Sequence, residues 1–170
     1  IALISFSVDA QYCSPTFSSG CAGWQVISAT IGSSVDWTSS DCYNSDQTAM
    51  IAEADPMDSL PMTVTTGIWC GCSVWVDWDN SSSFEDSENL HHQYIGGDPS
   101  FTYSFNIGIP PGTALGQYRM RIIGAWGSDG YSEGDNGFGP CGSYQYGSFD
   151  DFTLDVTTTT SVPDLDADYA

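Results

Sequence analysis

Apolar and polar residues alternate along several short stretches of the chain, which is the pattern of half-buried β-strands. The clearest alternation runs over residues 101–109, where five apolar side chains share one face: Phe101, Tyr103, Phe105, Ile107 and Ile109. Further strands are predicted at residues 24–31, 62–66, 117–123 and 148–156. Turn formers, including 18 Gly and 8 Pro, separate these stretches and interrupt every helical period. The sequence therefore predicts an all-β fold.

The strand predicted at residues 117–123 carries all the basic residues of the chain. Arg119 and Arg121 are the 2 basic side chains, and they share the face opposite to the apolar one. We expect them to form structural ion pairs with Asp150, Asp151 or neighbouring acids, because guanidinium groups bind carboxylates well in partly buried networks. A binding site for a ligand anion is the less favoured alternative.

The first ten residues form an apolar, β-prone run without a preceding hairpin partner. We expect residues 1–11 to be an N-terminal strand arm, residues 12–156 a β-sandwich domain and residues 157–170 an acidic C-terminal tail. An apolar terminal strand either belongs to its own sandwich or is given to a neighbouring subunit. Donation is favoured because both faces are apolar and residues 9–11 can act as a hinge. The predicted assembly residues are Ile1, Ala2, Leu3, Ile4, Phe6 and Val8.

The charge of the chain is strongly one-sided, with 22 acidic residues against 2 basic ones and a formal net charge of −20. Phosphate backbones and anionic membrane surfaces repel such a protein, so nucleic acid is excluded as a partner. No segment is long and apolar enough for membrane insertion, and we expect Ile1 to be the mature terminus left after signal removal. Copies of the protein pack together only where cations or salt offset their repulsion.

Six cysteines in this composition predict three disulfides made in an oxidising compartment, and hence an extracellular protein. The pairing stays open at this stage. A zinc site is the weaker alternative, because Cys70 and Cys72 are separated by a single residue and zinc ligands usually lie further apart. The predicted disulfide residues are Cys13, Cys21, Cys42, Cys70, Cys72 and Cys141.

An acidic loop after residues 74–76 has the spacing of a calcium-binding EF-hand loop. With Asp77 first, side-chain oxygens fall at the third, fifth, seventh, ninth and twelfth positions, and calcium takes about six to eight oxygen ligands. Ser82 stands where the EF-hand has glycine and no predicted helix flanks the loop, so a solvated acidic turn is the alternative. Calcium is the predicted cofactor, with the ligands Asp77, Asp79, Ser81, Ser83, Glu85 and Glu88.

Four short blocks occur in order along the second half of the chain: VWVDWD at residues 74–79, GQYRMR at 116–121, PCG at 140–142 and GSFDDFT at 147–153. They resemble the VWIDWN, GxTRMR, PCG and GEVEDYT blocks of the GEVED-type domain of secreted bacterial proteins. Ser148 and Asp150 replace the two glutamates of the last block, and Asp151 is retained. The resemblance implies an extracellular, immunoglobulin-like antiparallel β-sandwich of the kind that often accompanies adhesins, and it implies no reaction.

Other candidate sites have weaker support. His91 and His92 lack a nucleophile pattern beside them, so we expect a surface turn and not a metal site or a catalytic base. No apolar pocket is identified for the raised-pKa acid of a glycosidase, and we expect no enzyme. The 6 Trp favour core packing over a sugar-stacking platform. Asn80 opens an N-glycosylation sequon, and residues 157–160 are threonines suited to O-glycans.

These features together predict a structural subunit of an extracellular bacterial fibre or pilus. Residues 1–8 would insert into a neighbouring subunit, as in donor-strand pilins, and disulfides and calcium would stiffen the polymer. The partners would be other copies of the chain in a helical homopolymer, with surface glycans as a further partner. The alternative is a monomeric calcium-dependent adhesion or carbohydrate-binding module, and a hydrolase comes third. Deletion of residues 1–8 would abolish assembly of a fibre but only destabilise a monomer.

Overall fold

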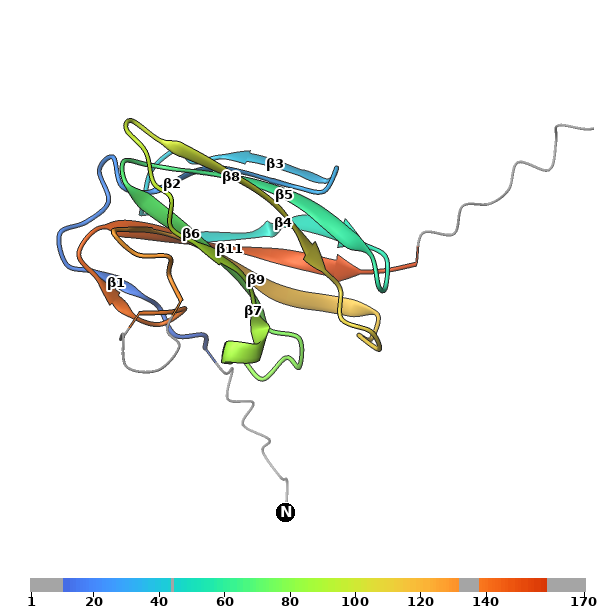
Figure 1. Cartoon of the computed structure of the whole chain (residues 1–170). Coiled ribbons are helices and arrows are strands. Elements are labelled where there is room, and N and C mark those ends of the chain that lie inside the picture. The colour runs from blue at the N-terminus through green and yellow to red at the C-terminus, as the bar shows by residue number, and fades with distance from the viewer. Residues whose placement is uncertain (1–10, 44, 132–137, 159–170) are drawn as a thin grey trace, which may run out of the picture.

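The computed structural model describes residues 11–43, 45–131 and 138–158, and their regular structure is almost entirely strand (Figure 1). A five-stranded sheet has the order β4 (Asp46–Ala54), β11 (Gly147–Val156), β9 (Gly116–Trp126), β6 (Cys70–Val76) and β7 (Asn89–Gln93). A four-stranded sheet has the order β3 (Val35–Thr38), β2 (Val26–Ile31), β5 (Ser59–Thr66) and β8 (Phe101–Gly108). The predicted all-β sandwich is thus confirmed.

Most neighbouring strands of the two sheets run antiparallel, and the exception lies at an edge. β4 pairs with β11 in parallel, and the register shifts between Asp151 and Thr153. The Thr153 hydroxyl donates to the Thr48 carbonyl at 2.9 Å and thereby holds the two strands together beside this shift. A separate two-stranded parallel sheet joins β1 (Thr16–Phe17) to β10 (Ser143–Tyr144).

The main core fills the space between the two sheets. Alternate residues of β8, β9 and β11 point into it, as the apolar alternation predicts, and Trp37 meets Phe152 edge-on with ring centroids 5.5 Å apart. All seven residues of β6 are buried, because β1, β10 and the segment before β1 cover the other face of the five-stranded sheet. A second cluster around Trp75 and Tyr144 fills that outer layer.

The predicted surface turn at His91 and His92 is wrong, because both residues belong to β7. β7 forms an antiparallel ladder with β6, in which His91 lies opposite Val74. The His91 ring stacks on Phe105 with centroids 3.6 Å apart, and burial lowers the pKa of His91 to about 4. A neutral imidazole packs like any other flat apolar ring at this edge.

Two disulfides form, Cys13–Cys141 and Cys21–Cys42, and the predicted third one is wrong. Cys70 and Cys72 are buried free thiols on one face of β6. Residues two apart on a strand lie about 6.6 Å from each other, whereas the two Cβ atoms of a disulfide lie within about 4.5 Å. The extended conformation of β6 therefore keeps the two sulfurs from bonding.

Two predicted segments fall largely outside the described residues: residues 1–10 of the strand arm and residues 159–170 of the tail. Within the described part of the chain, no helix is long and apolar enough to cross a bilayer. Regular helix is limited there to the short 3₁₀ turn η1 (Asp86–Glu88).

Candidate functional site

The acidic loop begins where β6 ends, and its first carboxylate is fully buried. Asp77 Oδ1 accepts a hydrogen bond from the Ser81 amide at 3.0 Å, and its Oδ2 accepts one from the Ser82 amide at 2.9 Å. Asp79 Oδ1 accepts from the same Ser81 amide at 3.0 Å. The backbone therefore curls around two carboxylates, as it does in a loop that presents oxygens to a cation.

The last predicted ligand returns to the same place through η1. Glu88 is 5 % exposed, and its carboxylate accepts hydrogen bonds from the Trp78 amide at 2.6 Å and the Glu85 amide at 3.0 Å. Burial raises the pKa of Glu88 to about 7. A cation at this position would stabilise the charged form that burial disfavours.

Three of the predicted ligands meet in space. One carboxylate oxygen each from Asp77, Asp79 and Glu88 lies within 4.8 Å of the other two. Ligand oxygens on opposite sides of a calcium ion lie about 5 Å apart, because each sits about 2.3–2.6 Å from the metal. The cluster thus has the donor type and the spacing that fit calcium.

The remaining predicted ligands, Ser81, Ser83 and Glu85, contact one another. The Ser81 and Ser83 hydroxyls are 2.9 Å apart, and the Ser83 hydroxyl donates to Glu85. These three side chains are exposed, as Asp79 is, and they form a second oxygen group beside the first. Ser82 has a φ of +66°, so it adopts the left-handed conformation for which the EF-hand position has glycine.

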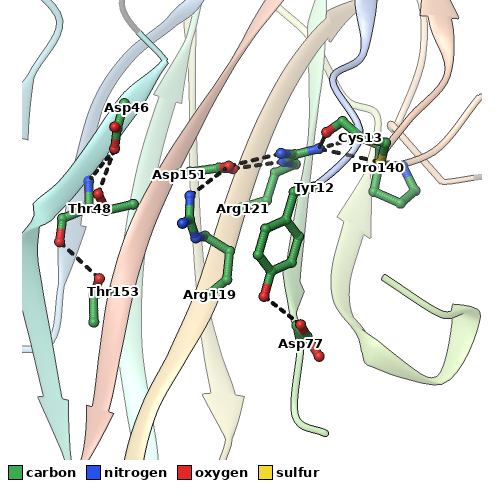
Figure 2. A network of polar contacts seen from close by, with 10 residues as sticks. All are labelled: Tyr12, Cys13, Asp46, Thr48, Asp77, Arg119, Arg121, Pro140, Asp151 and Thr153. Carbon is green, nitrogen blue, oxygen red and sulfur yellow. Dashed lines mark hydrogen bonds and ion pairs between the residues drawn. The ribbon is translucent and has the colours of Figure 1, made fainter. Parts of the chain in front are cut away.

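Tyr12 links the start of the described chain to this loop, and sequence reasoning did not identify it. Its hydroxyl donates to Asp77 Oδ2 at 2.5 Å (Figure 2). Its ring packs against Phe84 with centroids 5.2 Å apart. Burial, and then the hydrogen bond to Asp77, raise the pKa of Tyr12. The two residues are 65 positions apart, and no local sequence pattern predicts such a contact.

Arg121 forms the central buried ion pair of the outer layer. Its Nε and Nη2 donate to the two oxygens of Asp151 at 2.7 and 2.8 Å, and Nη1 donates to the carbonyls of Cys13 and Pro140 at 2.7 and 2.8 Å (Figure 2). The guanidinium lies between the rings of Phe84 and Phe149, 4.9 and 4.6 Å from their centroids. One side chain thus fixes three segments that are distant in sequence.

The two acids predicted to form ion pairs, Asp150 and Asp151, lie on opposite faces of β11. Arg119 contacts Asp151 at 3.3 Å and lies over the Tyr12 ring, as the sequence predicted for this face. The predicted pairing of Asp150 is wrong, because alternation along β11 turns Asp150 to the inner face, where its partner is Gln47 at 3.4 Å. Burial raises the pKa of Asp150 to about 8.

Ser148, which stands in place of the first glutamate of the GEVED block, also faces inward. Its hydroxyl accepts a hydrogen bond from the Val26 amide at 2.8 Å, so it joins the first residue of β2 to the opposite sheet. A short hydroxyl fits between the sheets at this position, where it is 4 % exposed.

Comparison with known protein families gives one match. The family model of the GEVED domain matches residues 71–155, which is half of the chain. The matched range holds the acidic loop, both arginines and Asp151, and so agrees with the resemblance carried by the four sequence blocks. No curated protein matches the chain.

Proposed function

The chain belongs to the GEVED domain family, and from this premise we propose that it is a non-catalytic structural subunit of an extracellular bacterial fibre. In this proposal residues 1–8 are donated as a strand to a neighbouring subunit, and residues 77–88 hold calcium. Family membership and two disulfides are consistent with an extracellular protein.

The observation that carries the proposal is where the strands of the sandwich lie in the sequence. Both sheets are built from strands between Val26 and Val156, and a continuous core is buried between them. Residues 1–8 lie outside the described part of the chain, and their apolar sequence is the additional strand that this proposal assigns to a neighbouring subunit. A second subunit is the partner that an additional apolar strand fits.

The base of the arm, by which we mean Tyr12 and Cys13, supports the same proposal. The Cys13–Cys141 disulfide and the hydrogen bond from Arg121 to the Cys13 carbonyl fix the chain to the outer layer. Tyr12 then bonds to Asp77, directly beside the acidic loop. A donated strand needs such a firm attachment, because any tensile force between two subunits acts on the residues that join the strand to its own subunit.

The sheets also offer edges that can accept a strand. Among the described residues, β4 and β8 are edge strands of nine and eight residues, long enough for an eight-residue donor, whereas the edge strands β3 and β7 are shorter. Addition to an edge supplies main-chain hydrogen bonds, and repeated head-to-tail addition propagates a filament.

Calcium has a physical role in this assembly. Each subunit carries a formal charge of −20, so close contact between subunits is repulsive unless cations lie among the carboxylates. The cluster of Asp77, Asp79 and Glu88 fits one such ion and adjoins the base of the arm.

Electron microscopy of the full chain with calcium tests the proposal. We expect fibres from the unmodified chain, and dispersed particles from the chain without residues 1–8 and from Phe6→Asp. A matched deletion of residues 163–170 and the substitution Ser7→Asp, which adds the same charge on the other face of the strand, should leave fibres intact. Fibres formed without residues 1–8, or only dispersed particles of the unmodified chain at high concentration, would overturn the proposal.

A calcium-dependent adhesion or carbohydrate-binding module is the second candidate, and one observation favours it. Trp69 and Trp126 are 47 % and 41 % exposed at one end of the sandwich. Such a module needs only the folded body, so loss of residues 1–8 would leave its binding intact.

A further inference from the structure

Four aromatic residues lie in hydrogen-bonded segments at the end of the sandwich where β11 begins: Trp24, Trp69, Trp126 and Tyr146. Tyr146 contacts two of them, with ring centroids 4.3 Å from Trp24 and 5.8 Å from Trp126. The rings come from the segments that precede β2, β6 and β11 and from the last residue of β9. We call these four residues the aromatic end.

Backbone hydrogen bonds hold the four segments together. They run from Trp126 N to Tyr146 O at 3.1 Å, Gly127 N to Trp69 O at 3.0 Å, Ile68 N to Gly23 O at 2.8 Å and Gly67 N to Gln25 O at 2.8 Å. Main-chain bonds do not depend on the rings, so removal of one ring leaves this frame in place. The aromatic end is therefore a fixed surface and not a set of mobile loop tips.

Trp69 is held in a costly conformation that its burial does not explain. Its φ is +51°, a region that bulky residues avoid at a cost of about 1–3 kcal/mol. A Cβ on Gly96 would lie 3.2 Å from both the Trp69 Cα and its ring, so the surroundings are shaped to this conformation. The side chain nevertheless stays 47 % exposed. A strained backbone that keeps an aromatic ring exposed is typical of a binding residue.

The size of the surface limits the kind of ligand. An aromatic side chain offers about 150–250 Å² in all, so the exposed parts of Trp69 and Trp126 amount to on the order of 100 Å² each. A stable protein interface needs roughly 800 Å² on each partner. The aromatic end matches a few sugar rings far better than it matches a protein surface.

The charge distribution selects among sugars. Arg119 and Arg121 are the 2 basic residues of the chain, and Arg121 is 1 % exposed. Arg119 lies seven residues from Trp126 along β9, about 23 Å at the rise of a strand. An anionic glycan would meet a charge of −20 without a nearby cation, whereas the apolar CH faces of a neutral sugar can stack on exposed rings. The exposed Gln145, next to Tyr146, adds an amide for hydroxyl groups.

We infer that the aromatic end is a binding surface for neutral oligosaccharides, with Trp69 and Trp126 as its main stacking residues. Trp69 lies just before the first residue of β6, and the acidic loop begins just after its last residue. The aromatic end and the acidic loop are therefore roughly 25 Å apart. Binding at the aromatic end thus requires neither calcium nor polymerisation. The aromatic end can therefore bind its ligand both in a fibre and in a monomer.

The test measures binding of the full chain to neutral and anionic oligosaccharides by array and calorimetry. The neutral probes are cellohexaose, xylohexaose, mannohexaose and chitohexaose, and the anionic ones are hexamers of galacturonate and a sulfated galactan. We expect binding to at least one neutral probe, reduced tenfold or more in Trp126→Ala and Trp69→Gly. Leu115→Ala, a change at another exposed apolar residue beyond the opposite end of β9, should bind as the unmodified chain does.

Trp69→Gly separates a binding role from a structural one. Glycine adopts a positive φ without strain, which offsets part of the burial lost with the half-buried indole, so this variant should stay folded, with a cooperative urea transition, while its binding is lost. The inference would be overturned if the chain bound no neutral probe or bound anionic probes alone. It would also be overturned if Trp126→Ala and Trp69→Gly bound as tightly as the unmodified chain. Loss of fibres in both variants with sugar binding unchanged would instead assign the aromatic end to a contact between subunits.

Discussion

At the scale of single residues, Arg121 shows how a buried charge is accommodated in this fold. Its guanidinium is 1 % exposed, and a carboxylate and two carbonyls accept its hydrogen bonds. Arg119 sits two residues away on the same face, is 31 % exposed and makes one contact of 3.3 Å with Asp151. The two arginines look alike in sequence, but only one of them organises the outer layer.

We expect Arg121→Met to lower the free energy of unfolding by about 3–5 kcal/mol, because it leaves Asp151 buried with little compensation. Arg119→Met is the matched control and should cost less than about 1 kcal/mol, because Arg119 is partly exposed and Asp151 keeps its two bonds from Arg121. Urea denaturation of both variants measures the difference. Equal losses would contradict the role assigned to Arg121.

Because of Asp150, we expect the free energy of unfolding to depend on pH. Burial raises its pKa from 3.8 to about 8, so between these values the folded state binds a proton that the unfolded state has released. Stability from this group is therefore present below about pH 4 and falls as the pH rises towards 8. Asp150→Asn removes this effect and should raise the free energy of unfolding at pH 8 by a few kcal/mol, with little change at pH 4.

The measurement is urea denaturation of both proteins from pH 4 to pH 9. A constant difference between the two proteins across this range would show that Asp150 does not titrate as its burial implies.

At the scale of elements, β6 and the loop after it form one structural unit. The strand is buried along all seven residues, and its rigid end places Asp77 where the loop folds back on it. Because η1 returns Glu88 to the same point, three carboxylates meet at the end of this strand. Ser82 shows that a residue other than glycine can take the left-handed position of such a loop.

Calcium at about 100 times its dissociation constant should stabilise the chain by roughly 2.7 kcal/mol, which raises the melting temperature by several degrees. Asp79→Asn should abolish this gain, because it removes an exposed ligand of the cluster without disturbing the core. Asp86→Asn, a neighbouring exposed acid outside the cluster, should keep it. Thermal melts with calcium, magnesium and chelator provide the measurement, and an equal response of the two variants would argue against a calcium site.

At the scale of the whole molecule, one disulfide joins two segments of the outer layer, and the other joins the connection before β2 to the connection after β3. Cys13–Cys141 joins residues 128 positions apart, and Cys21–Cys42 joins residues 21 positions apart. The first closes around most of the domain, and Arg121 bonds to the carbonyl of one of its cysteines.

Replacement of each pair by serine should lower stability by about 5 kcal/mol for Cys13–Cys141 and about 3 kcal/mol for Cys21–Cys42, because longer loops lose more entropy on closure. Urea denaturation of the two double variants compares them. A larger loss from the shorter loop would show that native-state contacts, and not chain entropy, dominate the effect.

The sequence by itself determined what depends on local pattern. Alternation at residues 101–109, 117–123 and 148–156 predicted strands that the structure contains, because side chains on a strand point to opposite faces in turn. The ordered blocks predicted the GEVED family, and the spacing of the acidic loop predicted three carboxylates that meet within 4.8 Å. Each of these features is set by residues close together in the chain.

Only the tertiary structure decided what depends on which segments meet. Cys70 and Cys72 stay free because β6 is extended, and Asp150 turns away from the arginines because β11 alternates in a register fixed by its neighbours. Tyr12 reaches Asp77, and four aromatic residues gather at one end, through contacts between segments far apart in sequence. Such contacts follow from how the strands pair, and strand pairing is a property of the whole fold that no single stretch of residues specifies.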